Sequence, residues 1–316
     1  MARMEDRPED FVVAIDFGGT KVAVGTAGLD GTLIRSARID TDAPRGAQQV
    51  VARALALARD LRDATAEETD GRCSGAGAVS PGIVSDGAVL LAPNVPGWGE
   101  LALPSLLREG LGTPTVAVGN DVNAAALAEA RWGVLRGADP ALFVSLGTGI
   151  AAGIVIGGRI FEGAHGAAGE IGYSLRHPAD DTAYSDGHAP LEEFVGGRAI
   201  GDRAGRALGI DLTAADAFER GDLPAGFLEE TISELSMQLA NVAIALDPAR
   251  VAIGGGLMAH ADVIIPALRA RMRSAVPFPP EVVAAEFPSD GALRGAVALA
   301  LDMAAARESD PSEVAS

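Results

Sequence analysis

Apolar residues along this chain gather into short runs that end in glycine. The first run, residues 11–17 (FVVAIDF), leads into Gly-Gly-Thr at 18–20, and two more follow at 22–27 and 33–39, with Asp-Gly between them. Runs of this length, rich in β-branched residues and joined by tight glycine turns, are typical of paired strands. The pattern predicts a meander of three strands.

The same pattern returns about 130 residues later, and such internal repeats indicate repeated architecture. Residues 141–146 (ALFVSL) lead into Gly-Thr-Gly at 147–149, followed by 150–156, a Gly-Gly turn, and the short run 159–161. Two copies of one plan predict two similar α/β halves rather than a solenoid.

The remaining elements follow from helical and strand periodicity. Helices are expected at 48–66, 122–132, 227–246 and 293–306, with another beginning near Leu257; further strands are expected at 76–84, broken at 80–82, and at 250–253. We expect an N-terminal α/β domain over 1–118 that also takes the helix at about 293–306, and a larger C-terminal α/β domain over 119–292. The hinge is placed near 115–119, and 307–316 is expected to be a flexible tail.

Composition excludes several classes of function. Of the 316 residues 48% are hydrophobic and 22% charged, and the net charge of −18 disfavours nucleic acid as a partner, because phosphate backbones attract basic surfaces. No apolar run approaches the roughly 18 to 20 residues of a membrane span, and no secretory signal is visible. The single cysteine, Cys73, excludes an internal disulfide. We therefore expect a cytoplasmic protein.

The glycine turns have two interpretations. Residues 147–152 (GTGIAA) satisfy the dinucleotide fingerprint, but that fingerprint requires a following helix, and the next residues have a hairpin pattern; no Walker motif occurs either. A glycine-rich hairpin can bind phosphate through backbone N–H groups, or it can serve only as a tight turn. Two such turns, each with threonine, favour a triphosphate. Asp16 would hold Mg²⁺, often through water, and Lys21 is either a phosphate partner or a solvated strand residue.

Several motifs in order resemble one family. They are DFGGTK at 16–21, NDVNAAALAE at 120–129, LGTG at 146–149, GAAGEIG at 166–172 and the triglycine at 254–256. Together they resemble the ROK family (repressors, open reading frames, kinases), which includes bacterial glucokinases, over about residues 11–300. The resemblance implies an actin-like ATPase (ribonuclease H-like) α/β fold, with two domains, sugar and ATP in the interdomain cleft, and a homodimer.

The family pattern implies a role for individual residues. Asp121 is the expected general base, although a residue at a helix N-terminus can also be only a cap. The expected substrate-binding residues are Asn94, Asn120, Asp121, Glu170, Tyr173 and Glu192, with Pro81-Gly82 lining the sugar side. The expected nucleotide-binding residues are Asp16, Gly18, Gly19, Thr20, Lys21, Gly147, Thr148, Gly149, Gly254, Gly255 and Gly256.

The chain departs from the family's zinc-containing members. Those members have His after GEIG and then a cysteine-rich loop, whereas this chain has Tyr173 and a loop, 174–190, without cysteine. The family's structural zinc site cannot form. The loop contains other ligand types, namely His177, Asp180, Asp181, Asp186 and His188, but a solvated polar loop is favoured over a substitute metal site. His165 and His260 are expected to be structural or exposed.

These observations predict ATP- and Mg²⁺-dependent phosphorylation of a hexose hydroxyl, the 6-OH of glucose or a related sugar. An amino-sugar or N-acyl-hexosamine kinase remains an alternative, as does a non-catalytic sugar sensor, and polyphosphate could replace ATP. The family's repressors carry a winged helix-turn-helix ahead of the first strand. Here ten residues precede Phe11, so a repressor is disfavoured.

Overall fold

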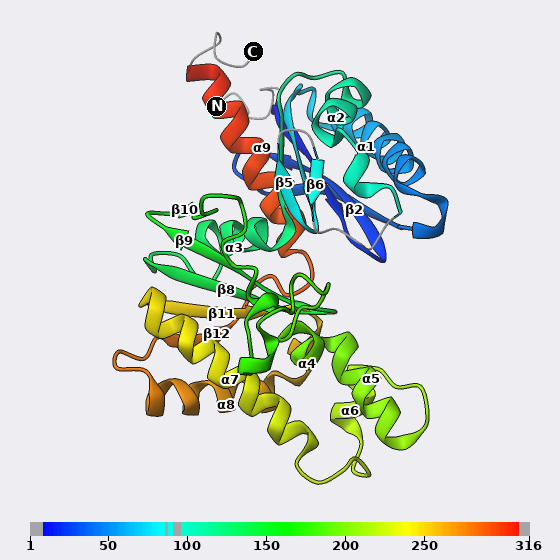
Figure 1. Ribbon diagram of the computed structural model, residues 1–316. Helices are drawn as coiled ribbons and strands as arrows, with labels where there is room; N and C mark the ends of the chain where they lie inside the picture. The colour runs from blue at the N-terminus through cyan, green and yellow to red at the C-terminus, as the bar shows by residue number, and fades with distance from the viewer. Residues whose placement is uncertain (1–8, 86–87, 91–95, 310–316) are drawn as a thin grey trace. The chain divides into compact units, whose positions relative to one another are not determined.

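The computed structural model describes residues 9–85, 88–90 and 96–309, which form two compact units (Figure 1). One unit comprises the described residues up to Ala128 together with those from Asp290 onward, and the other comprises Glu129–Ser289. The first crossing between the units therefore falls between residues 128 and 129, inside the helix that spans Asp121–Arg131. The sequence placed this boundary at 118/119, ten residues earlier.

The first unit is built on a five-stranded sheet of order β3-β2-β1-β4-β7. The expected meander is formed by β1 (Phe11–Phe17), β2 (Lys21–Gly28) and β3 (Leu33–Asp40), which pair antiparallel. Two further strands, β4 (Cys73–Ser80) and β7 (Val116–Asn120), run parallel to β1. Three parallel strands therefore end at one edge of this sheet.

Helices cover both faces of the first sheet. Ala76 and Ala78 belong to the core formed with α1 (Ala47–Thr69) and α2 (Leu103–Leu111). Gly77 points to the other face, toward α9 (Gly291–Ser309), where a Cβ at Gly77 would meet the Ala296 carbonyl oxygen at 1.9 Å. Glycine is required there because the α9 backbone approaches the strand so closely.

The last helix is longer than predicted. The sequence predicted a helix over 293–306 and a frayed tail from 307, but α9 continues to Ser309. Arg307 Nη1 donates to Thr115 Oγ1 at 2.5 Å, which fixes this last turn to the segment before β7. The tail prediction is therefore wrong for 307–309; residues 310–316 lie outside the described part of the chain.

The second unit repeats the plan of the first, with sheet order β10-β9-β8-β11-β12. Its antiparallel meander consists of β8 (Ala141–Leu146), β9 (Ile150–Ile156) and β10 (Arg159–Ile160), and β11 (Arg250–Gly254) and β12 (Glu281–Ala284) extend it in parallel. The predicted repeat is confirmed, and so is the exclusion of a dinucleotide fold, because β9, not a helix, follows the Gly-Thr-Gly turn.

Helices α7 (Phe227–Leu246) and α8 (Ala261–Ala275) contribute to the second core, for example with Leu239 and Leu268, which belong to the same buried cluster as Leu142 of β8. The helix predicted near Leu257 begins as a 3₁₀ turn, Gly256–His260, and the α-helix starts only at Ala261. The other helices of the unit are α4 (Glu192–Val195), α5 (Gly197–Leu208) and α6 (Ala214–Glu219). Among the described residues, no helix combines the length and hydropathy needed to cross a bilayer.

The short remaining elements connect these layers. They are β5 (Ile83–Ser85), β6 (Ala88–Leu90), α3 (Asp121–Arg131) and the 3₁₀ turns Ala43–Arg45, Trp98–Glu100, Ile171–Tyr173 and Pro178–Asp180.

Glu129, near the end of α3, is a fully buried carboxylate that holds two distant backbone segments. Its Oε2 accepts from the Val134 N–H at 2.9 Å, and its Oε1 accepts from the Phe287 N–H at 2.8 Å. Removing the carboxylate would leave two partly buried N–H groups without this partner, and each such loss typically costs about 1–3 kcal/mol.

We predict that Glu129→Ala lowers the free energy of unfolding by about 3 kcal/mol, measured from urea midpoints at constant slope. Glu129→Gln is the matched control: its carbonyl oxygen can accept one N–H, while its NH₂ group faces the other, so about half the loss is expected. Equal stability of Glu129→Ala and the parent protein would contradict the assigned role.

Candidate active site

The carboxyl ends of β1, β4 and β7 bring two carboxylates to one edge of the first sheet. Asp16 of β1 is in register with Val79 of β4, and Ser80 of β4 is in register with Asn120 of β7. Val79 in turn pairs with Gly119 of β7, so Asp16 and Gly119 lie two strand spacings apart, roughly 10 Å between backbones. Asp121 follows two residues later, at the start of α3. The edge outside the carboxyl ends of parallel strands is where open α/β sheets bind ligands.

Both carboxylates are disfavoured as anions in the free protein. Burial of the carboxyl group, followed by repulsion from Asp121, raises the pKa of Asp16 to about 7, and Arg38 opposes the rise. Burial also raises the pKa of Asp121, although a hydrogen bond from the Val122 N–H to its Oδ1 at 2.9 Å works against this. Perturbed carboxylates of this kind are common at functional sites.

Asn120 caps the helix that follows β7. Its Oδ1 accepts from the Asn123 N–H at 2.9 Å, which is the N-cap interaction, and its Nδ2 donates to the Gly82 carbonyl at 3.0 Å. The cap function therefore belongs to Asn120, which leaves the Asp121 Oδ2 outside the capping hydrogen bonds. Asn120 also ties the Pro81-Gly82 turn to the start of α3. Its expected sugar contact stays a prediction.

The turn between β1 and β2 is fixed by Thr41. The Thr41 hydroxyl donates to the Gly18 carbonyl at 2.7 Å, and its N–H donates to the Thr20 carbonyl at 2.8 Å. A Cβ at Gly18 would lie 2.6 Å from the Lys21 carbonyl oxygen, so the turn requires glycine. Gly19, Thr20 and Lys21 are exposed.

In the second unit the other two glycine segments lie side by side. Gly254, the last residue of β11, is in register with Ser145 of β8, so the glycines that follow the two strands lie at the same edge of the sheet. Gly255 has φ of 91°, and a Cβ there would meet the Leu146 carbonyl oxygen at 2.5 Å. Turn 147–149 and the triglycine 254–256 thus form one glycine-rich surface, as phosphate binding through backbone N–H groups requires.

Glu192 lies against this surface. Its Oε2 accepts from the Ile150 N–H at 3.1 Å, and a Cβ at Gly149 would lie 1.9 Å from that same oxygen. The start of α5 holds the turn from a second side, because the Gly197 N–H donates to the Gly147 carbonyl at 2.9 Å. Glu192, an expected sugar contact, is therefore hydrogen-bonded to the residue that follows the turn 147–149, an expected phosphate contact.

Glu170, Tyr173 and Glu192 also belong to one electrostatic group. Burial, then Glu170 and Glu192, raise the pKa of the Tyr173 hydroxyl. The Tyr173 ring meets the exposed Tyr184 edge-to-face, with centroids 5.6 Å apart. Three of the expected sugar contacts are thus brought together within this unit. Asn94 lies outside the described residues.

Three of the five candidate metal ligands of the loop 174–190, Asp180, Asp186 and His188, take part in local hydrogen bonds. Asp180 accepts from the N–H groups of Arg176 and His177, Asp186 accepts from the Thr182 hydroxyl at 2.6 Å, and His188 Nδ1 lies 3.1 Å from Glu193. The described residues contain no group of three acidic, His or Cys side chains that would hold a metal.

The donor set fits a magnesium–nucleotide complex better than an all-protein cage. Mg²⁺ in phosphoryl-transfer sites is commonly held by one or two carboxylates, substrate phosphates and water. Burial and repulsion from Asp121 raise the pKa of Asp16 to about 7, so a nearby cation would stabilise its ionised form.

Sequence reasoning missed Arg38, which lowers the pKa of Asp16. Asp16, Ala23 and Arg38 are in register across β1, β2 and β3, so their side chains share a face. The signal was present, because the turn positions of the meander fix this register. Tyr184 was also missed, and nothing in its loop sequence indicates the contact with Tyr173.

Comparison with known proteins supports the sequence resemblance. The ROK family profile matches residues 12–303. A glucokinase of Halalkalibacterium halodurans is 29% identical over 283 residues, covering 83% of this chain and 84% of that protein. An N-acetylmannosamine kinase of Escherichia coli is 30% identical over 296 residues, covering 91% and 97%.

A solved structure extends the comparison to the fold. The ROK family glucokinase of Streptomyces griseus in complex with glucose and AMPPNP matches with a TM-score of 0.73 at 26% identity, covering 92% of this chain and 98% of that one. The predicted actin-like ATPase fold is confirmed by this similarity and by the two repeated sheets. This chain belongs to the ROK family.

Proposed function

We propose that this protein is a sugar kinase that transfers the terminal phosphoryl group of ATP to a hexose hydroxyl, with Asp121 as the general base. The observation that carries the proposal is the pair of carboxylates, Asp16 and Asp121, at the carboxyl edge of one sheet. In this arrangement one carboxylate serves the nucleotide's metal and the other serves the attacking hydroxyl. ATP as donor is supported by the AMPPNP complex of the similar glucokinase.

Asp121 orients the acceptor before it takes the proton. Phosphoryl transfer passes through a loose transition state in which positioning and charge stabilisation dominate. The raised pKa of Asp121 makes its carboxylate a stronger base than an exposed aspartate. With Oδ1 held by the Val122 N–H, Oδ2 is the oxygen that accepts the hydroxyl proton as the oxygen–phosphorus bond forms.

The glycine turns hold the phosphates. In the first unit the turn 18–20 presents Gly19 and Thr20 at the surface, and in the second unit the turn 147–149 adjoins Gly254–Gly256. Mg²⁺, when bound, neutralises phosphate charge beside Asp16. Lys21, which is exposed, adds a positive charge to the same turn.

The acceptor is proposed to be glucose, with an N-acyl-hexosamine or amino sugar as the second candidate. Glucokinases and N-acetylmannosamine kinases both occur among the relatives, so family membership does not select between them. Glu170, Tyr173 and Glu192 are the proposed acceptor-side contacts, and ionised carboxylates accept hydrogen bonds from neighbouring sugar hydroxyls. We further propose a cytoplasmic homodimer with no nucleic-acid partner.

Asp121→Asn is predicted to lower kcat by at least about a hundredfold while the protein stays folded, as expected when a general base is removed. The measurement is a coupled ADP-release assay, with circular dichroism as the check on folding. Asp60→Asn, at an exposed position of α1, is the matched control and should retain full turnover. Near-normal kcat in Asp121→Asn would refute the assignment.

Asp16→Asn is predicted to stabilise the metal-free protein at pH 8 while impairing its use of Mg²⁺. The folded pKa of about 7 lies above the ordinary value of 3.8, so ionisation removes stability as the pH rises from about 4 to about 7. At pH 8 the parent protein bears this cost in full, roughly 2–4 kcal/mol. The asparagine variant avoids it.

The measurement for Asp16→Asn is urea unfolding in EDTA at pH 5 and pH 8, with the Mg²⁺ dependence of turnover measured in parallel. The stability gain should be larger at pH 8, and half-saturation should need at least about tenfold more Mg²⁺. Asp30→Asn is the control of opposite sign, since Thr32 lowers the Asp30 pKa. A destabilised Asp16→Asn at pH 8 would contradict the electrostatic account.

A panel of sugars with magnesium-ATP, compared by kcat/KM, tests the proposed function and its acceptor together. We expect glucose to exceed N-acetylmannosamine and glucosamine by at least about tenfold, because a site whose acceptors are covered by the bound sugar rejects analogues that leave them without a hydroxyl partner. A higher kcat/KM for N-acetylmannosamine would select the second candidate. Absence of turnover with every sugar would favour a sensor.

A further inference from the structure

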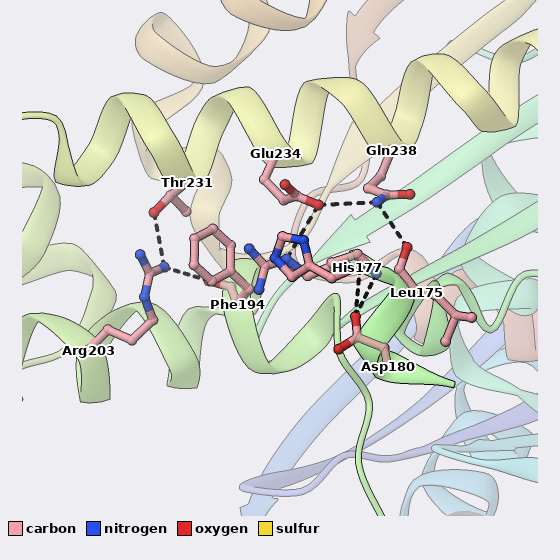
Figure 2. Close-up of polar contacts among 9 residues, drawn as sticks. Leu175, His177, Asp180, Phe194, Arg203, Thr231, Glu234 and Gln238 are labelled. Carbon is pink, nitrogen blue, oxygen red and sulfur yellow. Dashed lines mark hydrogen bonds and ion pairs between the residues drawn. The ribbon is translucent and has the colours of Figure 1, made fainter. Parts of the chain in front are cut away.

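The ring of Phe194, on α4, is contacted by the guanidinium groups of two arginines, Arg176 and Arg203; Figure 2 shows Arg203 beside the ring. The Arg176 guanidinium carbon lies 3.5 Å from the ring centroid, and that of Arg203 lies 3.7 Å from it. Two guanidinium groups cannot occupy the same face at these distances, so they cover opposite faces. We call this arrangement of Arg176, Phe194 and Arg203 the Arg–Phe–Arg stack.

One side of the stack ties the loop 174–190 to α7. Arg176 Nε lies 3.3 Å from Glu234 Oε1, an ion pair in which the side chains are only 16% and 13% exposed. Gln238 Nε2 donates to the same Glu234 oxygen at 3.1 Å and to the Leu175 carbonyl at 3.4 Å (Figure 2). The start of the loop is therefore held by a largely buried charge pair and by a backbone contact.

The other side ties α4 to α5 and α7. Arg203 Nη1 donates to the Phe194 carbonyl at 2.9 Å and to the Thr231 hydroxyl at 3.1 Å (Figure 2). Burial lowers the pKa of Arg203 and Glu230 raises it, but a guanidinium remains charged at any working pH. Cation–π attraction strengthens as the cation is withdrawn from water, and both arginines are partly withdrawn from it.

The stack contacts α4, a helix too short to be stable without tertiary contacts. Helix α4 is a single turn of four residues, and isolated turns are unstable without tertiary contacts. Glu192 and Phe194 lie on this turn, so a shift of the Phe194 ring moves the backbone that carries Glu192. The Leu191 N–H, which donates to the Gly172 carbonyl at 3.1 Å, links the same turn to the segment of Glu170.

We propose that Arg176, Phe194 and Arg203 are positioning residues that set the carboxylate of Glu192 for the acceptor sugar. The stack ties the cysteine-free loop, α4 and α7 together through charge and an aromatic ring. The proposal depends on the proposed kinase function for its kinetic consequence. Its structural consequence, a fixed Glu192 Oε2 against the Ile150 N–H, holds independently of that function.

Phe194→Leu keeps apolar volume and removes the aromatic ring. The sugar KM should rise about tenfold, equivalent to about 1.4 kcal/mol, with kcat within about threefold. The ATP KM should change by less than about twofold, because the Gly197 and Arg198 N–H groups still hold the turn 147–149. Phe194→Tyr keeps the ring and should restore the parent sugar KM. Equal effects on both KM values, or none, would overturn the proposal.

Arg176→Met tests the cation separately, since methionine retains much of the aliphatic length without the charge. The matched control is Arg206→Met, at an exposed position of α5, which should leave both KM values unchanged. Combined with Phe194→Leu, Arg176→Met should add less than its single effect on the sugar KM, since both changes break the same interaction. Full additivity would overturn the proposal. This variant also replaces Phe194→Leu if that protein fails to fold.

Hydrogen exchange at the Ile150 amide gives a readout that needs no turnover. In Phe194→Leu and Arg176→Met this amide should exchange at least about tenfold faster than in the parent protein, because its acceptor is Glu192. Unchanged exchange in both variants would overturn the positioning role. A parent protein inactive on every sugar would refute the kinase function, while the exchange result would still decide the role of the stack.

Discussion

The direction of the parallel strands is the constraint on which the candidate site depends. In each sheet an antiparallel meander is extended by two strands parallel to its first member, so the chain leaves three neighbouring strands at one edge. In the first sheet, Asp16, the glycine turn after it and the pair Asn120-Asp121 lie at that edge. In the second sheet, the turn 147–149 and the triglycine 254–256 lie at the corresponding edge. Within each sheet, strand register therefore brings together groups that lie far apart in the sequence.

The same geometry makes the free site electrostatically costly. Asp16 and Asp121 are partly withdrawn from water at one sheet edge, and the pKa values of both rise. Arg38, in register with Asp16 across the meander, relieves only part of this cost. A carboxylate pair that is unfavourable when empty gains most from a bound cation and a hydrogen-bonding hydroxyl. The raised pKa values of Asp16 and Asp121 therefore mean that ionisation of this pair lowers the stability of the free protein.

The sequence predicted what is local and missed what depends on distant partners. Both meanders and the long helix 227–246 were predictable, because period-two runs and glycine turns are short-range signals. The end of α9 was not, because its last turn depends on a contact from Arg307 to Thr115. Within the site, the placement of Asp121 at a helix start was predictable from a helical pattern. The sequence did not predict that Asn120 hydrogen-bonds both the Asn123 N–H and the Gly82 carbonyl, because Gly82 belongs to a turn far away in the sequence.

The loop 174–190 has no cysteine to anchor it through a metal, and contacts with residues outside the loop hold it instead. Its own polar side chains form hydrogen bonds close in sequence, as with Asp180 and the N–H groups of Arg176 and His177, and these shape the loop without attaching it. The loop is attached by contacts with residues outside it: Arg176 lies on the Phe194 ring and pairs with Glu234, and the Leu175 carbonyl accepts from Gln238. Since Phe194 shares a helical turn with Glu192, and Glu192 accepts from the N–H that follows the turn 147–149, loop and turn are joined through one side chain. A ligand that draws the Glu192 carboxylate away from the Ile150 N–H would weaken that hydrogen bond, so the segment that carries Glu192 and the turn 147–149 are coupled within this unit.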